Sequence, residues 1–342
     1  MTDFSDRPPV EQRQIVERSS TLQDLFDGEH RGQKAEFKAD VIPELSQHTA
    51  AFETAWKQNF NSLKTALGTQ LNGKDSNMSA QKRAEVEVMS QQLDDLNDMQ
   101  SGERIAMFKA FRDNTATMSQ AQAASDKVQQ AMRAGYMPAA LDGQRDVVHL
   151  VSGLNQKATS AVIASTEKVL AREKDPSVKA ALEASLDDAR SISAAPFVEK
   201  ARLGAFLLND GKPYQAEKML NDALNTAVPG DGWKLKSNRD LRQNVKDETM
   251  QLHVQNNLSE LFDQNVDKLD PSHGKHVVMD ELKANQGKGD ESFAALTKFL
   301  TDNYTYLTRH HWPIVSKPGI STDDIKDYVQ ERAKGINDLK LP

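Results

Sequence analysis

The sequence predicts an all-α protein in which a long antiparallel helical bundle is followed by a short α-solenoid-like section of helical hairpins. Apolar residues recur three or four positions apart in one segment after another, which is the spacing of a single helix face. Only 6% of the residues are aromatic, and Ala, Gln, Lys, Asp and Leu are frequent, a composition that favours helices over sheets. The alternation of apolar and polar residues that is typical of strands is hard to find.

Length and composition indicate a globular protein with several parts. The chain has 342 residues, of which 38% are hydrophobic and 27% charged. The first part is polar and irregular, with breaks at Pro8-Pro9, Gly28 and Gly32. The expected parts are a flexible N-terminal arm at residues 1–32, a long-helix bundle at 33–135, a helical-repeat-like section at 144–269 and a C-terminal helical section at 270–342.

The bundle begins with one long amphipathic helix from Pro43 to Leu71. Its apolar face consists of Leu45, Phe52, Trp56, Phe60, Leu63, Leu67 and Leu71. Gly73 to Ser79 is the expected turn. A second helix then carries an apolar seam of the coiled-coil type, formed by Val86, Met89, Leu93 and Leu96. We expect these two helices to pack antiparallel.

A third helix starts at Ile105 and runs toward Met132. The segment from Gly135 to Pro138, together with Gly143, is rich in residues that interrupt helices. The sequence therefore predicts that the bundle ends here, at a domain boundary.

The repeat-like section opens with one predicted helix over residues 144–174. Its apolar face contains Val147, Val151, Leu154, Ala158, Ala161 and Val162. Asp175-Pro176 then supplies a capping residue and a first-turn proline for the next helix.

Residues 201–224 predict a helical hairpin. Leu203, Phe206 and Leu207 form one face of its first helix, and Gly211 can adopt the positive φ that ends such a helix. Pro213 suits the first turn of the second helix. In that helix Ala216, Leu220 and Ala223 share one face, and the two alanines allow a neighbouring helix to approach closely.

This hairpin resembles a tetratricopeptide repeat. The matching residues are Leu203-Gly204, Gly211, Ala216 and Ala223-Leu224. A second set, consisting of Leu182, Leu186 and Ala189, lies 34 residues before Ala216, Leu220 and Ala223, and about 34 residues is the period of this repeat class. The resemblance covers residues 160–228, and it implies a protein that binds a partner.

The C-terminal part is predicted from similar signals. Pro229 to Gly232 is a turn, and a helix follows with Val254, Leu258, Leu261, Phe262, Val266 and Leu269 on one face, closed by Asp270-Pro271. Residues 285–290 form a loop. The last helix begins at Ser321, which forms a capping box with Asp324, and ends at Gly335.

The sequence predicts no catalytic, cofactor-binding or metal-binding residue, and no cofactor. The chain has no cysteine, which removes disulfides and thiolate chemistry, and it lacks the motifs of serine hydrolases, phosphate-binding loops and zinc proteases. The closest candidates for metal ligands are His273 and His276, near Asp270 and Asp280, together with His310-His311 before Trp312. Glu44 and His48 form a single pair one helical turn apart, which is more often a surface contact than a ligand set. Acid pairs such as Asp94-Asp95, Asp187-Asp188 and Asp323-Asp324 are interpreted as solvated faces or helix starts.

One basic cluster is the candidate for binding. Basic residues around an aromatic side chain can bind an acidic peptide or a phosphate, although a solvated helix start is the alternative interpretation. The expected partner-binding residues are Tyr214, Trp233, Lys234, Lys236, Arg239 and Arg242, with an acidic protein segment as their ligand.

The resulting hypothesis is a non-enzymatic helical scaffold or adaptor that binds a protein partner. Two alternatives stay open: an exported bacterial effector or structural assembly component, and an enzyme whose site is built from distant polar residues. A net charge of −7 argues against a nucleic-acid partner, and no apolar segment predicts a membrane span. We expect a cytoplasmic protein, or one secreted without a cleavable signal peptide, in which the long helices offer a seam for a homo-oligomer.

Overall fold

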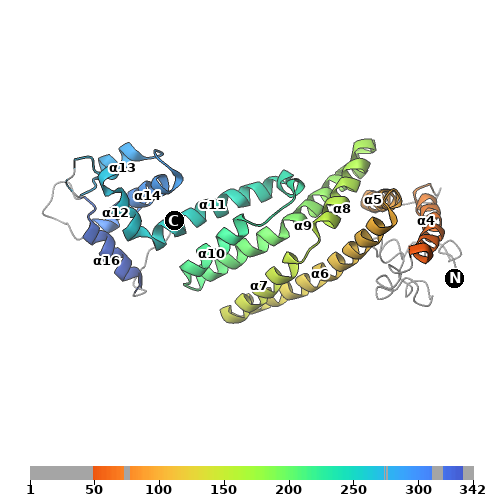
Figure 1. Cartoon of the computed structure of the whole chain (residues 1–342), viewed down its shortest axis with the longest axis horizontal. Coiled ribbons are helices and arrows are strands. Elements are labelled where there is room, and N and C mark those ends of the chain that lie inside the picture. Colours follow the sequence, from red (N-terminus) through yellow and green to blue (C-terminus); the bar gives the residue numbers. More distant parts are fainter. Residues whose placement is uncertain (1–48, 73–77, 273, 275, 310–318, 334–342) are drawn as a thin grey trace. The chain divides into compact units, whose positions relative to one another are not determined.

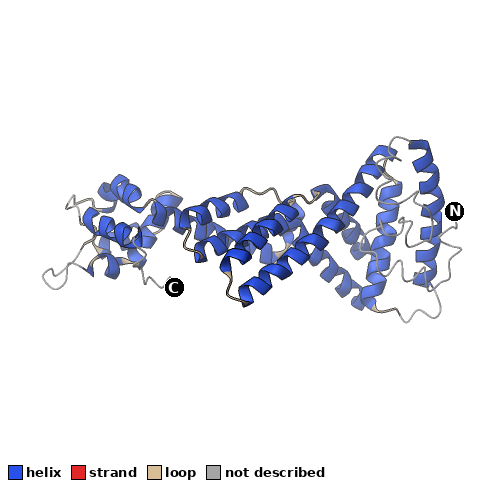
Figure 2. Ribbon diagram, turned by 90° about the horizontal axis from the view of Figure 1, so that it is seen from below, coloured by secondary structure: helices blue, strands red, loops and turns tan. Residues whose placement is uncertain are grey.

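The computed structural model describes residues 49–72, 78–272, 274, 276–309 and 319–333 (Figure 1). This described part is all-α, as predicted, and Figure 2 shows helices throughout it. Its only β-type pairing is an isolated antiparallel bridge between Val277 and Ile320. No helix in these ranges is both long enough and apolar enough to cross a membrane. The predicted N-terminal arm lies outside the described residues.

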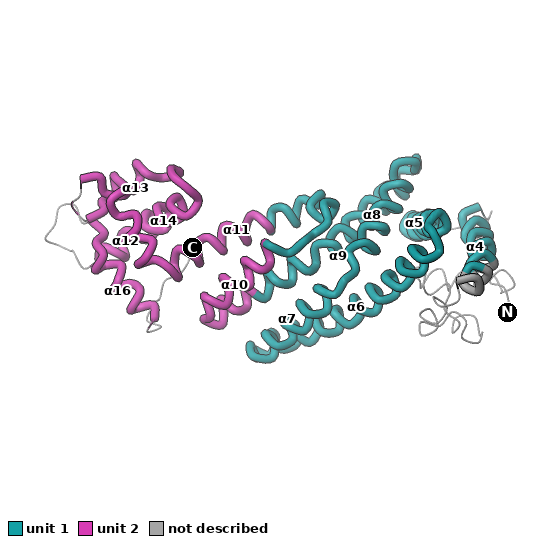
Figure 3. Tube along the Cα trace, viewed as in Figure 1, with its two compact units in different colours: residues 1–203, 225–241 teal, residues 204–224, 242–342 magenta. Residues whose placement is uncertain are grey.

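The chain forms two compact units, coloured separately in Figure 3. Unit 1 contains residues 1–203 and 225–241, and unit 2 contains residues 204–224 and 242–342. The chain therefore changes unit three times: inside helix α9 (Pro176–Asn209), at the end of helix α10 (Pro213–Leu224) and inside helix α11 (Lys236–Asn256). The arrangement of a bundle followed by a solenoid, and the four predicted parts, stay predictions.

Unit 1 begins with three helices around a shared core. They are α4 (Thr49–Asn72), α5 (Ala80–Asn97) and α6 (Ser101–Arg133). The α4 and α5 helices run antiparallel, because Trp56 Nε1 donates to Asn97 Oδ1 at 3.1 Å while Lys64, two turns further along α4, reaches back to Asp94 at 2.9 Å. Their predicted apolar faces form the core, which includes Trp56, Leu63, Leu67, Val86, Leu93, Leu96, Phe108 and Phe111.

The next helix, α7 (Met137–Ser152), folds back along α6. The turn uses Gly135 at φ 69°, but Gly143 lies inside α7, so the break predicted there is wrong. A β-carbon at Gly143 would lie 2.9 Å from a methyl group of Val128 on α6. This glycine therefore serves the close approach of two helices.

The single helix predicted over residues 144–174 is also wrong, because the chain breaks at 153–155 between α7 and α8 (Gln156–Arg172). Asn155 caps α8 by accepting hydrogen bonds from the backbone N–H groups of Lys157 and Ala158. The side chain of Asn114 on α6 holds the backbone of Asn155. Asn114 Oδ1 accepts a hydrogen bond from Asn155 N–H at 2.7 Å, and Asn114 Nδ2 donates one to Asn155 O. The apolar spacing continues across the break, which is why periodicity alone missed it.

The predicted start of α9 is confirmed: Asp175 Oδ1 accepts from the N–H of Ser177 at 2.8 Å, directly before Pro176 opens the first turn. The helix then continues without interruption through Pro196 to Asn209. Leu182 and Leu203, which the repeat spacing assigns to successive units, therefore lie on one helix. The tetratricopeptide resemblance stays a prediction.

Unit 2 contains the predicted hairpin, in which the end of α9 meets α10 (Pro213–Leu224). Gly211 has φ 71° and donates to Leu208 O, while Lys212 N–H donates to Leu207 O. These two bonds form a Schellman motif, the helix end that a glycine favours. Ala216, Leu220 and Ala223 are buried, as the sequence predicts.

The rest of unit 2 packs around its own core. The helices are α12 (Leu258–Leu269), α13 (Met279–Asn285), α14 (Glu291–Asp302), α15 (Tyr304–Leu307) and α16 (Thr322–Ala333). Val254 belongs to α11 and Leu258 to α12, so the single helix predicted across them is wrong, with the break at Asn257. The Asn257 side chain donates to His253 O at 2.9 Å and so satisfies a carbonyl at the end of α11.

Two local predictions are confirmed in this unit. The loop between α13 and α14 contains Gly287 and Gly289, both at positive φ. Ser321 and Asp324 form the predicted capping box, in which Ser321 N–H donates to the Asp324 carboxylate at 2.8 Å and Asp324 N–H donates to Ser321 Oγ at 3.3 Å. The predicted end of this helix at Gly335 lies outside the described residues.

Candidate functional site

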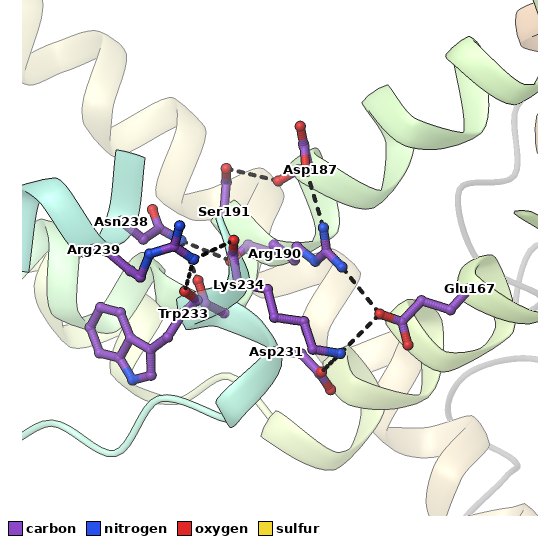
Figure 4. Close-up of polar contacts among 10 residues, drawn as sticks. Glu167, Asp187, Arg190, Ser191, Asp231, Trp233, Lys234, Asn238 and Arg239 are labelled. Carbon is purple, nitrogen blue, oxygen red and sulfur yellow. Dashed lines mark hydrogen bonds and ion pairs between the residues drawn. The ribbon is translucent and has the colours of Figure 1, made fainter. Parts of the chain in front are cut away.

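Figure 4 shows three residues of the predicted basic cluster, Trp233, Lys234 and Arg239, which lie in unit 1. Trp233 belongs to a short 3-10 helix, η3 (Gly230–Lys234), and its ring meets the Phe197 ring edge to face at 5.2 Å. Phe197 lies on α9 and is fully buried. The aromatic residue of the cluster therefore anchors η3 to the core of unit 1.

Lys234 is held by two carboxylates. Its Nζ lies 2.7 Å from Asp231 and 3.1 Å from Glu167 of α8. The hydrogen bonds to Asp231 and then Glu167 raise the pKa of Lys234. Glu167 also pairs with Arg190 of α9 at 3.1 Å, so one carboxylate joins η3, α8 and α9 (Figure 4).

Arg239 and Asn238, from the first turn of α11, bind the backbone of η3. Arg239 Nη1 donates to the carbonyl oxygens of Trp233 at 3.0 Å and Lys234 at 2.8 Å. Asn238 is buried and donates to Gly232 O at 2.7 Å. These bonds satisfy carbonyl groups at a helix end, which gives both residues a structural role.

The other three predicted residues lie at the surface. Lys236 is exposed, and no ion pair is recorded for it within the described part of the chain. Arg242 is exposed and belongs to unit 2. Tyr214, also in unit 2, is 67% exposed, and its hydroxyl donates to Asn256 O at 3.4 Å. The use of these residues by an acidic partner stays a prediction.

Most of the histidine candidates lie outside the described residues, namely His273, His310 and His311, as do Trp312, Glu44 and His48. His276 is described and exposed. Among the residues that can be described, no group of three or more acidic or histidine side chains has the arrangement of a metal site. Asp270 is buried and accepts from the N–H of Ser272 at 3.0 Å, as expected for the residue that closes α12.

Unit 2 contains a groove that the sequence did not predict. We call it the α11–α14 groove, because it lies between these two helices and ends at α15 and Arg309. Its volume is about 1200 Å³. The α11 side consists of Gln243, Lys246, Asp247, Met250, Gln251 and Gln255. The α14 side consists of Glu291, Ala294, Ala295, Lys298, Phe299 and Asp302.

Each side of the groove is one face of one helix. The α11 residues are separated by steps of three, one, three, one and four positions, and the α14 residues follow nearly the same pattern. Met250 comes from α11, whereas Ala294, Ala295 and Phe299 come from α14, with Tyr306 of α15 at one end. The short alanine side chains leave space between the two helices, so the lining combines apolar surface with room for a ligand.

The charged groups at the rim are mostly paired. Lys246 of α11 reaches Glu291 of α14 at 2.6 Å, and Lys298 pairs with Asp302 at 2.5 Å. All four side chains are largely exposed, so each pair contributes little to stability, typically below about 1 kcal/mol. A ligand can therefore exchange these contacts for its own at small cost.

The far end of the groove is organised by Arg309. Its guanidinium lies 3.9 Å from the centre of the Tyr306 ring and pairs with Glu331 of α16. Tyr306 Oη also donates to Glu331 at 2.8 Å. Glu331 thus joins the last turn of α16 to the two residues that end the groove.

Comparison with known proteins adds no relative. No protein-family model, no curated protein and no solved structure matches the chain. The site is therefore interpreted from its geometry alone.

Sequence reasoning missed the groove because its two sides come from helices about 45 residues apart in the chain. A partial signal exists in α14, where Phe293, Leu296 and Leu300 form the buried face while Ala294 and Ala295 extend the apolar surface beyond it. An apolar face that is wider than the surface covered by one neighbouring helix is such a signal. On α11 the amide and charged residues of the groove face look like an ordinary solvated surface.

Proposed function

We propose that the protein is a non-enzymatic interaction protein whose α11–α14 groove binds an amphipathic helix of a protein partner. The observation that carries the proposal is the groove itself, which is lined by one face of each of two helices and has an apolar part that includes Met250, Ala294 and Phe299. Docking of an amphipathic helix into a groove between helices is a common mode of peptide recognition.

The size of the groove fits this ligand. A helix is about 10 Å wide and rises about 1.5 Å per residue, so ten residues fill a cylinder of about 1200 Å³. The groove has about the same volume. Pockets for small molecules are usually smaller, about 300–1000 Å³.

The lining also favours binding over chemistry. It contains amide, carboxylate, ammonium, guanidinium, hydroxyl and apolar groups, without a serine, cysteine or histidine at the positions that line it. The Ser–His and Cys–His pairs that many hydrolytic sites use are therefore not among these residues. Amides such as Gln251 and Gln255 can instead bond the polar flank of a helix whose apolar face meets Ala294 and Phe299.

The proposal is tested by blocking the groove at one alanine. Ala294→Arg places a long charged side chain inside the groove, whereas Ala284→Arg places the same side chain on the exposed surface of α13. The two variants and the unchanged protein are used to select helices of twelve residues from a peptide-display library. We expect the unchanged protein and Ala284→Arg to select the same amphipathic sequences, and Ala294→Arg to bind them at least about tenfold more weakly.

Two results would contradict the proposal. One is selection of peptides that bind all three proteins equally, since such peptides use another surface. The other is the absence of any selected peptide while circular dichroism shows that all three proteins are folded. Lys236→Glu in the same assay separately tests whether the exposed end of the basic cluster contributes to an acidic ligand.

A further inference from the structure

We infer that the helix bound in the α11–α14 groove carries a basic side chain on its polar flank, and that Asp247 of α11 is the residue that recognises it. This inference rests on the proposed function, because it names the chemistry of the partner for the same site. The ligand of the groove thus differs from the acidic segment that the sequence predicts for the basic cluster around Trp233. The apolar lining provides affinity for amphipathic helices in general, and Asp247 distinguishes among them.

Among the described residues, Asp247 is the one charged side chain of the groove lining for which no ion pair is recorded. It is exposed and accepts a hydrogen bond from Gln243 at 2.8 Å, which leaves further acceptor positions on its carboxylate. An acidic ligand must displace an existing carboxylate from its cation, whereas a basic ligand finds a carboxylate open to it. The ion pairs of the lining are Lys246 with Glu291, Lys298 with Asp302, and Arg309 with Glu331.

Asp247 lies at the end of the groove where α14 begins. Its neighbour Lys246 reaches Glu291, the first residue of α14, whereas Arg309 lies at the opposite end. Within the described part of the lining, the groove therefore offers an unpaired negative charge at one end and a paired positive charge at the other. The position of the basic residue along a ligand helix then determines the direction in which that helix lies.

Two amides continue the row that Asp247 begins on α11. Gln251 and Gln255 follow at intervals of four residues, or about 6 Å along the helix, and both line the groove. No hydrogen bond of either side chain is recorded within the described ranges. A ligand helix presents every fourth residue at the same interval, so one basic and two neutral polar side chains can face this row. Amides both donate and accept, so Asp247 is the only position of the row that requires a charge.

The net charge of the chain acts in the same direction. It is −7 at pH 7, so the field of the protein attracts a cationic ligand before contact and raises its association rate. An opposite charge at the rim of the groove adds to this attraction and disfavours acidic competitors. Both effects weaken as added salt shortens the screening length.

Charge reversal at Asp247 tests the inference. The peptides are the helices of twelve residues that the unchanged protein selects from the display library, and we expect them to carry Lys or Arg on the polar flank. Asp247→Lys should bind these peptides at least about tenfold more weakly, whereas Asp247→Glu, which keeps the carboxylate, should change binding less than about twofold. Asp327→Lys is the matched control, because it makes the same charge change at an exposed position of α16 outside the groove lining. It should also change binding less than about twofold.

A second peptide separates charge recognition from a general disturbance of the groove. In this peptide glutamate replaces the basic residue of a selected sequence. It should bind the unchanged protein at least about tenfold more weakly than its parent does, and it should regain most of that loss on Asp247→Lys. The affinity of the parent peptide should fall with added salt, and it should fall less for Asp247→Lys.

Three results would overturn the inference. They are selection of peptides without a basic residue, unchanged binding of the basic peptides to Asp247→Lys, and an equal loss of both peptides on that variant while circular dichroism shows it folded. Each of them leaves the proposed function intact if Ala294→Arg still weakens binding. Failure of the proposed function is recognised separately, by equal binding to Ala294→Arg and Ala284→Arg or by the absence of any selected peptide, and the inference then fails with it.

Discussion

Arg104 shows how a single buried charge holds three segments of unit 1 together. Its guanidinium donates to the carbonyl oxygens of Leu96, Asn97 and Met99 at 2.8, 3.0 and 2.7 Å, and so satisfies carbonyl groups at and just beyond the end of α5. It also bonds Glu53 of α4 at 2.6 Å. The side chain is only 7% exposed, so water cannot replace these bonds.

We predict that Arg104→Met lowers the free energy of unfolding by about 3 kcal/mol, because one buried and two partly buried carbonyl oxygens and one carboxylate lose their donor. Urea denaturation measures this loss. Arg145→Met is the control, since Arg145 is half exposed and pairs with the exposed Asp142, which predicts a change below about 1 kcal/mol. Similar losses for the two variants would contradict the structural role of Arg104.

The same contact predicts a pH dependence. Burial raises the pKa of Glu53, but the hydrogen bonds from Ser101 and Arg104 outweigh it and the net pKa is lowered. Because the pKa is lower in the folded protein, the ionised Glu53 stabilises the folded state at pH values above the ordinary carboxyl pKa. This stabilisation is lost as the pH falls through the lowered pKa. The stability difference between Arg104→Met and the unchanged protein should therefore shrink in acid.

Glu248 on α11 has the opposite behaviour. Burial raises its pKa, and no hydrogen bond to its carboxylate is recorded among the residues described. Because the pKa is higher in the folded protein, Glu248 does not destabilise the fold at pH values below the ordinary carboxyl pKa, where it is protonated. Stability is lost as the pH rises through the raised pKa and the buried carboxylate becomes charged. We predict that Glu248→Gln is more stable than the unchanged protein at pH 8 and equally stable at pH 3. Glu183→Gln is the control, because Glu183 is exposed on α9. In urea denaturation this variant should not gain stability at pH 8 over the unchanged protein.

At the scale of elements, the hairpin of α9 and α10 depends on Gly204. A β-carbon there would lie 2.5 and 2.7 Å from two side-chain carbons of Leu220, which is itself 1% exposed and has little room to move. We predict that Gly204→Ala destabilises the protein by about 1–3 kcal/mol, although alanine favours a helix. Gly68→Ala on α4 is the matched control, because nothing lies within 4 Å of the added carbon. It should stabilise the protein by about 0.5–1 kcal/mol in thermal denaturation. Two changes of the same sign would contradict this packing argument.

Elements whose ends carry their own signals could be predicted from the sequence. Gly211 at φ 71°, Asp175 before Pro176 and the Ser321 capping box each act through bonds to near neighbours in the chain. The breaks at Asn155 and Asn257 could not be predicted from periodicity, because the apolar spacing continues across them. At Asn155 the break is fixed by a contact with Asn114, 41 residues earlier.

Side-chain pairing also changed the interpretation of several charged residues. Asp94 and Asp95, predicted as a solvated pair, bond Lys64 of α4 and Ser165 and Lys168 of α8. Burial raises the pKa of Asp95, but hydrogen bonds led by Lys168 outweigh burial and lower it. The basic cluster near η3 behaves in the same way, with Lys234 held by acids. Composition shows that such charges exist, but only the fold shows which of them have partners.

At the scale of the whole molecule, the groove is a property of tertiary structure. The α11 face from Gln243 to Gln255 is mostly polar in sequence and becomes one wall of a groove only because α14 lies opposite to it. The change of unit inside α9, between Leu203 and Gly204, and inside α11, between Leu241 and Arg242, is hidden for a similar reason, because both helices continue through it without a break.

Each unit has an apolar core of its own, which leads to the last prediction. Leu63 is fully buried among residues of α4, α5, α6 and α8, and Leu296 is fully buried among residues of α11 to α16. Leu63→Ala and Leu296→Ala each remove a side chain from a closed core, which costs about 2–5 kcal/mol. Because local opening follows cooperative units, we expect Leu296→Ala to accelerate amide hydrogen exchange in α12, α14 and α16, and Leu63→Ala to accelerate it in α4, α5 and α6. Exchange that rises equally in both sets of helices for either variant would show that the chain opens as a single unit, and the groove of unit 2 would then depend on the core of unit 1.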